Sequence, residues 1–194
     1  MALAAGEVTI EHREIVLKDR PEALHSISKK GTVPVLSIDS STIIDESLDI
    51  MIWVIDHCSL DWLDYDKNMQ LEIIKVNDLN FKQRLDKYKY YDRHPESSYE
   101  FYQEECKQFL LRYDSLLESN SFLCGEKIQC LDIAIFPFIR QCAHIDSKWF
   151  EKEFINLNRW LESLKSCSLF LSIMHKLPIW NQRDQGIIIN YNNL

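Results

Sequence analysis

Three side chains in the first quarter of the chain could recognise the charged ends of a small molecule. Ser47 stands at the start of a helical pattern, where a hydroxyl and the free N–H groups of a helix N-terminus can bind a carboxylate. Glu46 can pair with an ammonium, and Arg20 can make a forked contact with a carboxylate. Simpler roles are open to each: Ser47 as a helix cap, Glu46 as a partner of the helix dipole, and Arg20 as a solvated surface charge.

The elements that must position these residues are short. Apolar runs predict strands over Glu11–Leu17, Val35–Ile38 and Thr42–Ile44, the last two joined as a hairpin. Between them, Pro21–Ile27 predicts a short helix with Asp19 available as its cap.

From Ser47 onward, apolar residues recur at intervals of three and four, which predicts helices. After the helix at Ser47, further helices are expected at 67–90, 98–119, 129–143, 154–165 and 168–175. The sequence therefore predicts an α/β domain over residues 1–58 and an all-helical domain over residues 62–180.

Charge and hydropathy narrow the function classes. A net charge of −8 argues against general nucleic-acid binding, which needs a basic face. Lys82–His94 is basic and aromatic, but acidic residues interrupt it, so we expect a solvated helix end. No apolar run is long enough to span a bilayer and no leader indicates export, so we expect a cytoplasmic protein without a membrane partner.

The cysteines lie at positions 58, 106, 124, 130, 142 and 167 and form no CxxC pair. Most fall in apolar helical patterns, where cysteine acts as a small hydrophobe. We therefore expect reduced thiols, with a metal site as the weaker alternative.

Motifs in both halves of the chain resemble the glutathione S-transferase superfamily. The run Gly31-Thr32-Val33-Pro34-Val35-Leu36, followed by Asp45-Glu46-Ser47, resembles its glutathione-binding half. The run Phe122-Leu123-Cys124-Gly125, followed by Leu131-Asp132-Ile133-Ala134, resembles a buried helix of its second domain. Leu17-Lys18-Asp19-Arg20-Pro21-Glu22 is most similar to omega-type and related bacterial members. The resemblance implies a thioredoxin-like domain followed by an all-helical domain.

The resemblance also implies a glutathione site. In the family, the residue before a cis-proline, matched here by Val33 and Pro34, offers its backbone N–H and C=O to the cysteinyl amide. Glu46 and Ser47 match the acidic–serine pair that holds the γ-glutamyl group. Arg20 matches a basic residue near the glycyl or cysteinyl end of the peptide.

One helix of the second domain is apolar on every side. Leu131–Ile139 is interrupted only by Asp132 in its first turn, where a carboxylate can accept backbone N–H groups. We expect this helix to be central and buried. Gln129 stands where the family has a serine or threonine cap, so the resemblance implies a weakened helix start.

The family begins with a strand, then a loop whose cysteine, serine or tyrosine acts on the glutathione sulfur, then a helix. Met1–Gly6 resembles the second half of that helix, so strand and loop are missing from the sequence as given and we assign no catalytic residue. The missing strand is expected between Glu11–Leu17 and Val35–Ile38, which would otherwise keep unpaired backbone groups. We expect Met1 to be an internal methionine of a longer reading frame, with a shortened, inactive product as the alternative.

Two classes of function remain open. The resemblance implies a homodimer with glutathione as co-substrate and a small electrophile or mixed disulfide as second substrate. Serine or tyrosine in the missing loop would imply a transferase, and cysteine a thiol reductase. The alternative is a non-catalytic interaction protein, similar to the stringent starvation proteins of bacteria, which the missing loop favours. The pairs Val33-Pro34 and Glu46-Ser47 speak against it, because a scaffold needs no peptide-binding site.

Overall fold

The computed structural model describes residues 1–191 and divides into two units. Met1–Leu60 and Ser168–Leu194 form the first unit, and Asp61–Cys167 form the second, called the helical unit below. The predicted helical domain ended at residue 180, but the structure groups residues from Ser168 onward with the first unit. The reason is packing: α10 (Ser168–Ser172) contacts α1 (Ala2–Ala5), and the segment beyond α10 pairs with an N-terminal strand.

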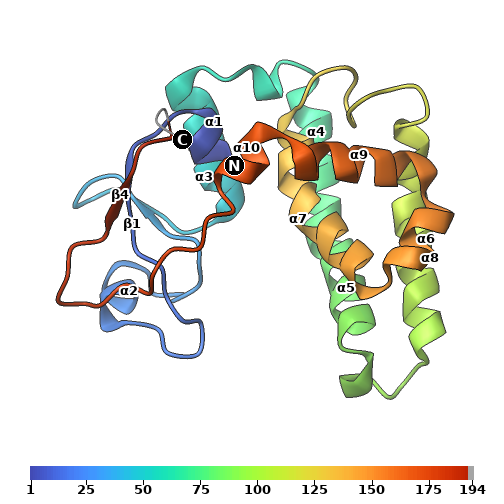
Figure 1. Ribbon diagram of the computed structural model, residues 1–194, viewed down its shortest axis with the longest axis horizontal. Helices are drawn as coiled ribbons and strands as arrows, with labels where there is room; N and C mark the ends of the chain where they lie inside the picture. Colours follow the sequence, from blue (N-terminus) through green and yellow to red (C-terminus); the bar gives the residue numbers. More distant parts are fainter. Residues whose placement is uncertain (192–194) are drawn as a thin grey trace. The chain divides into compact units, whose positions relative to one another are not determined.

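Two antiparallel strand pairs form the sheets of the first unit within residues 1–191 (Figure 1). β1 (Ile10–His12) pairs with β4 (Ile187–Ile189), with Glu11 opposite Ile188. β2 (Leu36–Ser37) pairs with β3 (Ile43–Ile44), with Leu36 opposite Ile44. The helices of this unit are α1, α2 (Glu22–Ile27), α3 (Ser47–Cys58) and α10.

The first strand is shorter than predicted. Beyond β1, pairing continues only as isolated bridges, such as the one between Glu14 and Ile179, where the Trp180 N–H donates to the Glu14 carbonyl at 2.8 Å. β4 was not predicted, although a run of β-branched residues after Gly186 is a strand signal. Among the described residues no strand pairs with both β1 and β2, and β4 gives β1 an antiparallel partner that the sequence analysis did not expect.

The β2–β3 hairpin is held by Asp39. Its Oδ1 accepts the backbone N–H groups of Ser41 at 2.7 Å and Thr42 at 2.8 Å, and the hydroxyls of both residues donate to the same carboxylate. These hydrogen bonds, the side-chain bond from Ser41 first among them, lower the pKa of Asp39 to about 2. The Asp39 side chain therefore stabilises the turn of the predicted hairpin by bonding Ser41 and Thr42 in that turn.

Helices α2 and α3 form close to their predicted positions. In α3, the buried residues Ile50, Val54 and Ile55 follow the predicted helical spacing. The cap predicted for α2 is wrong: the N-cap is Pro21, without a side-chain hydrogen bond, and Asp19 instead donates its backbone N–H to the Val16 carbonyl.

The helical unit confirms the predicted all-α character of the second half of the chain. Its elements are η1 (Asp61–Leu63), α4 (Lys67–Val76), η2 (Asn77–Phe81), α5 (Lys82–Lys89), η3 (Tyr91–Arg93), α6 (Tyr99–Leu116), α7 (Cys130–Ile145), α8 (Ser147–Glu153) and α9 (Ile155–Ser166). The helix predicted over 67–90 is interrupted by the π-helical turn η2. No helix of the described residues is long and apolar enough to cross a membrane.

Helix α7 is the buried centre of this unit, as predicted. Asp132 is fully buried and accepts three N–H groups, from the Leu123 backbone at 3.0 Å, the Gln129 backbone at 2.9 Å and Trp160 Nε1 at 2.8 Å. Burial raises the pKa of Asp132, although the three donors favour its charged form. The carboxylate therefore joins the loop before α7, the helix start and α9.

The start of α7 has a cap that the sequence analysis missed. Gln70, fully buried on α4, accepts the Leu131 backbone N–H on Oε1 at 3.0 Å. Its Nε2 donates to the Tyr65 carbonyl at 2.5 Å and to Gln129 Oε1 at 3.3 Å. A side chain 61 residues away in the sequence thus satisfies a donor that a serine or threonine cap commonly serves. Gln129 also forms a capping box with Asp132, so the expectation of a weakened start is wrong.

Candidate functional site

A loop between α2 and β2 leads into the candidate site. Gly31 in this loop is buried, has φ +60°, and donates its N–H to the Ser28 carbonyl at 3.1 Å. A Cβ on Gly31 would lie 2.6 Å from an atom of the His25 ring. Glycine therefore permits the left-handed turn that directs the chain into Val33.

Val33 is exposed, and its backbone is unpaired in the described range. The Val33–Pro34 peptide bond is cis, as the resemblance implies, and Val33 as a whole residue is 45% exposed. Neither the N–H nor the C=O of Val33 forms a hydrogen bond with another residue in the described range 1–191. This stretch of chain therefore has a free donor and a free acceptor side by side, as an unpaired strand edge does.

The register of the β2–β3 hairpin relates this stretch of chain to the start of α3. Leu36 is opposite Ile44 and Ser37 is opposite Ile43, so the chain before Leu36 runs alongside the chain after Ile44. Continued beyond β2, that register would place Pro34 opposite Glu46 and Val33 opposite Ser47. The grouping of these four predicted site residues stays a prediction.

Glu46 and Ser47 are both exposed at this helix start. Glu46 is the N-cap and Ser47 the first helical residue, but no side chain caps the helix; the Glu46 backbone carbonyl accepts the Ile50 N–H at 3.0 Å. The Ser47 hydroxyl forms no hydrogen bond within residues 1–191. The simpler role of Ser47 as a side-chain cap is therefore not observed, and its hydroxyl remains available to a ligand.

Lys30 is a neighbour of the site that the sequence analysis missed. Its Nζ lies 2.5 Å from Glu46 Oε1 and 3.3 Å from Asp45 Oδ1, and Asp45 Oδ2 accepts the Ser28 hydroxyl at 3.0 Å. The bonds to Glu46 and then Asp45 raise the pKa of Lys30, and the Ser28 hydroxyl is the main cause of a lowered pKa at Asp45. No local sequence signal identifies Lys30, because it lies 16 positions before Glu46 in the chain.

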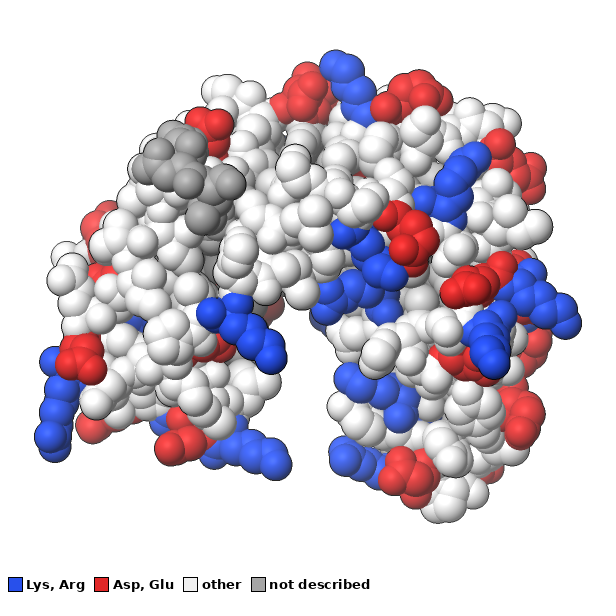
Figure 2. Space-filling view, in the orientation of Figure 1, with Lys and Arg blue, Asp and Glu red and all other residues white. Residues whose placement is uncertain are grey.

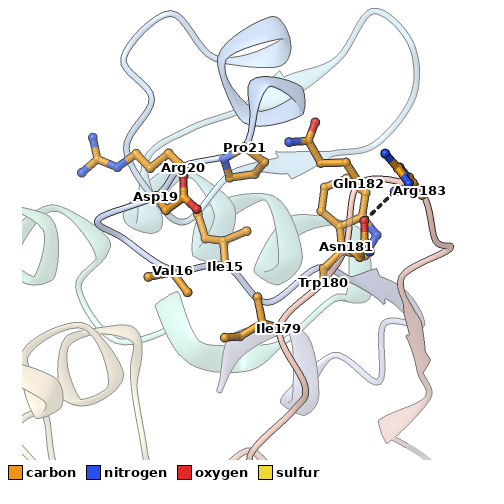
Figure 3. Close-up of a pocket in the computed structure, with 10 residues that line it drawn as sticks. All are labelled: Ile15, Val16, Asp19, Arg20, Pro21, Ile179, Trp180, Asn181, Gln182 and Arg183. Carbon is orange, nitrogen blue, oxygen red and sulfur yellow. Dashed lines mark hydrogen bonds between the residues drawn. The ribbon is translucent and has the colours of Figure 1, made fainter.

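Arg20 is the fifth predicted site residue. It lines a cleft of about 490 Å³ between the chain at Ile15–Pro21 and the segment Ile179–Arg183. Figure 3 shows its guanidinium directed away from the other residues that line the cleft. No hydrogen bond or ion pair within residues 1–191 joins Arg20 to Val33, Glu46 or Ser47.

Two family models match the chain, one in each unit. The description "Glutathione S-transferase, N-terminal domain" matches residues 1–59, which contain the open backbone at Val33 and the exposed pair at the start of α3. The description "Glutathione S-transferase, C-terminal domain" matches residues 96–163, which contain the buried helix α7. The chain belongs to the glutathione S-transferase superfamily. Residues 1–59 form its small thioredoxin-like domain, which is followed by the all-helical domain.

Solved glutathione transferases share this fold at low sequence identity. A family member from Pseudomonas fluorescens, crystallised with two glutathione bound, is 16% identical over 88% of this chain and 83% of its own, with a TM-score of 0.74. Poplar glutathione transferase F1 is 18% identical over 79% and 77%, with a TM-score of 0.64. The Gtt2-class enzyme of Vibrio parahaemolyticus is 21% identical over 80% and 79%, with a TM-score of 0.61. None of the curated proteins compared with the chain matches it.

Four of the six cysteines of this glutathione transferase relative are poor candidates for a reactive thiol. Cys106, Cys130 and Cys142 are fully buried. Burial is the main cause that raises the pKa of Cys124 and of Cys130 to about 12, so each is almost entirely protonated at neutral pH. A bond to Cys106 and burial raise the pKa of Cys142. These thiols act as packing groups, in keeping with their predicted role.

The basic side chains of the helical unit are interspersed with acidic ones. Figure 2 shows this mixture over the face in view, without one continuous basic area. At the predicted solvated end near Lys82–His94, the ammonium of Lys89 and the guanidinium of Arg93 lie 5.0 Å and 4.4 Å from the ring centroid of Tyr90. The aromatic residue therefore packs with cations of its own chain.

Proposed function

We propose that this member of the superfamily binds glutathione at the open chain before β2 and the exposed start of α3. Two observations carry the proposal: the unpaired backbone of Val33, and a helix start whose Ser47 hydroxyl is free within residues 1–191. Glutathione is a short peptide with two carboxylates and one ammonium, so it needs both backbone and charged partners.

Each partner has a defined role in this proposal. The Val33 N–H and C=O bond the cysteinyl amide, as an added strand would. Ser47 and the free N–H groups of the first turn of α3 receive the γ-glutamyl carboxylate. Glu46 receives the adjacent ammonium. Arg20 remains the predicted partner of the glycyl or cysteinyl end, although its side chain points away from the cleft that it lines (Figure 3).

Bound glutathione would serve as co-substrate in transfer to a small electrophile or in reduction of a mixed disulfide. The raised pKa values of Cys124 and Cys130 support assigning neither as the group that acts on the glutathione sulfur. The proposal includes a cytoplasmic homodimer, as the resemblance implies. Binding comes before either reaction and is therefore tested first.

Calorimetry with glutathione tests the proposal on the full chain. Ser47→Ala removes a hydrogen bond to a charged group, so we expect affinity to fall about tenfold or more. Ser40→Ala is the matched control, because Ser40 is exposed in the hairpin turn and has no side-chain bond in the described range. Equal affinities of the two variants would contradict the assigned role of Ser47, and an absence of binding by the wild type would contradict the proposal.

A further inference from the structure

Lys30 reaches the candidate site from outside the helix that carries Glu46. It lies in the loop after α2, 16 residues before Glu46, and its Nζ is 2.5 Å from Glu46 Oε1. The Lys30 and Glu46 side chains are 52% and 58% exposed. Ion pairs at such exposure contribute little to stability and rearrange easily, so the contact can be exchanged for another cation.

The lysine ammonium and the α-ammonium of a γ-glutamyl group are chemically alike. In each, the nitrogen is bonded to one carbon, carries one positive charge and has three N–H donors. Lys30 therefore satisfies Glu46 as the ligand ammonium is proposed to do. Two ammonium groups at one carboxylate would repel each other, so one must move away for the other to bind closely.

Asp45 provides the position to which Lys30 can move. Its Oδ1 lies 3.3 Å from Lys30 Nζ, and its Oδ2 is held by the Ser28 hydroxyl at 3.0 Å. Lys30 can leave Glu46 and keep an anionic partner. The free-energy cost of the exchange is then only the difference between the pairing of Lys30 with two carboxylates and its pairing with one.

We propose that Lys30 is an internal occupant of the ammonium position at Glu46, and that glutathione displaces it on binding. This inference rests on the proposed function and adds a residue that sets ligand selectivity. With Lys30 in place, the advantage of a ligand that carries an ammonium over one that lacks it is reduced. Removing the lysine amine frees Glu46 and increases that advantage.

The test uses two variants and two ligands with the full chain. Lys30→Met removes the competing ammonium, and Lys29→Met removes the same charge from a neighbouring exposed lysine that has no ion pair in the described range. The ligands are glutathione and its des-amino analogue, glutaryl-cysteinylglycine. Calorimetry at low salt, where exposed charges are least screened, measures all affinities.

We expect Lys30→Met to bind glutathione about three- to tenfold more tightly than Lys29→Met, corresponding to one surface charge contact. The des-amino analogue should show no such gain, and adding Glu46→Gln to Lys30→Met should abolish it. Equal or weaker glutathione binding by Lys30→Met would overturn the inference while leaving the proposed function intact. No binding of either ligand by the wild type or any variant would overturn both.

Discussion

Lys30 Nζ lies 2.5 Å from Glu46 Oε1, which ties the loop after α2 to the start of α3. The contact is exposed and screened by solvent, so it is expected to matter more for ligand binding than for folding. Lys30→Met should therefore unfold at the same temperature as Lys29→Met in a thermal melt. A clear loss of stability in Lys30→Met alone would identify Lys30 as a structural residue.

Gly31 fixes the direction of the loop that carries both Lys30 and Val33. Alanine at this position would keep φ +60° at a cost of about 1–2 kcal/mol and would place its Cβ 2.6 Å from His25. We expect Gly31→Ala to lower the free energy of unfolding by that amount or more in a denaturant titration. Adding His25→Ala to Gly31→Ala should recover only the part of the lost unfolding free energy that comes from the steric contact with His25. His25→Ala alone is the control. An unchanged free energy in Gly31→Ala would contradict the left-handed turn.

The Asp39 carboxylate makes the hairpin sensitive to acid. Its pKa is about 2 in the folded chain and 3.8 ordinarily, so folding favours the charged form. The stabilisation is fully present above pH 3.8 and is lost as pH falls towards 2. In an NMR titration the Asp39 carboxyl carbon should shift with a midpoint near 2, and Asp39→Asn should lose this part of the acid dependence. A midpoint at 3.8 would show that the turn hydrogen bonds do not form in solution.

Gln70 is expected to be essential to the buried start of α7. Gln70→Ala leaves the Leu131 N–H without its acceptor and opens a cavity at a fully buried position. The unpaired donor alone costs about 1–3 kcal/mol of unfolding free energy, measurable by urea titration. Gln108→Ala, an exposed glutamine on α6, should change it by less than about 0.5 kcal/mol. Similar effects of the two substitutions would show that the cap is not used.

The larger features of this fold could be predicted from the sequence because they follow strong periodic patterns. The helical spacing in α3 and the all-apolar α7 predict burial directly, and Asp132 in the first turn of α7 has the predicted role of accepting N–H groups. The order of motifs in both halves predicted the superfamily that the family models show.

The parts that were missed depend on contacts between residues distant in the sequence. β4 pairs with β1 at the opposite end of the chain, and α8 is a seven-residue helix between two longer ones. Gln70 caps a helix that begins 60 positions later, and Lys30 meets Glu46 only because the hairpin folds back. Local propensity contains no information on such pairs.

Glutathione binding at Val33, Glu46 and Ser47 is the central claim, and an amide NMR titration of the uniformly 15N-labelled chain tests it most directly. Increasing glutathione should shift the backbone N–H signals of these three residues along one saturation curve, because Val33 and Ser47 contact the ligand through the main chain or helix start and Glu46 through its carboxylate. The cleft residues Ile179–Arg183 serve as the internal comparison. Shifts confined to that cleft, or no saturable shift at all, would contradict the claim.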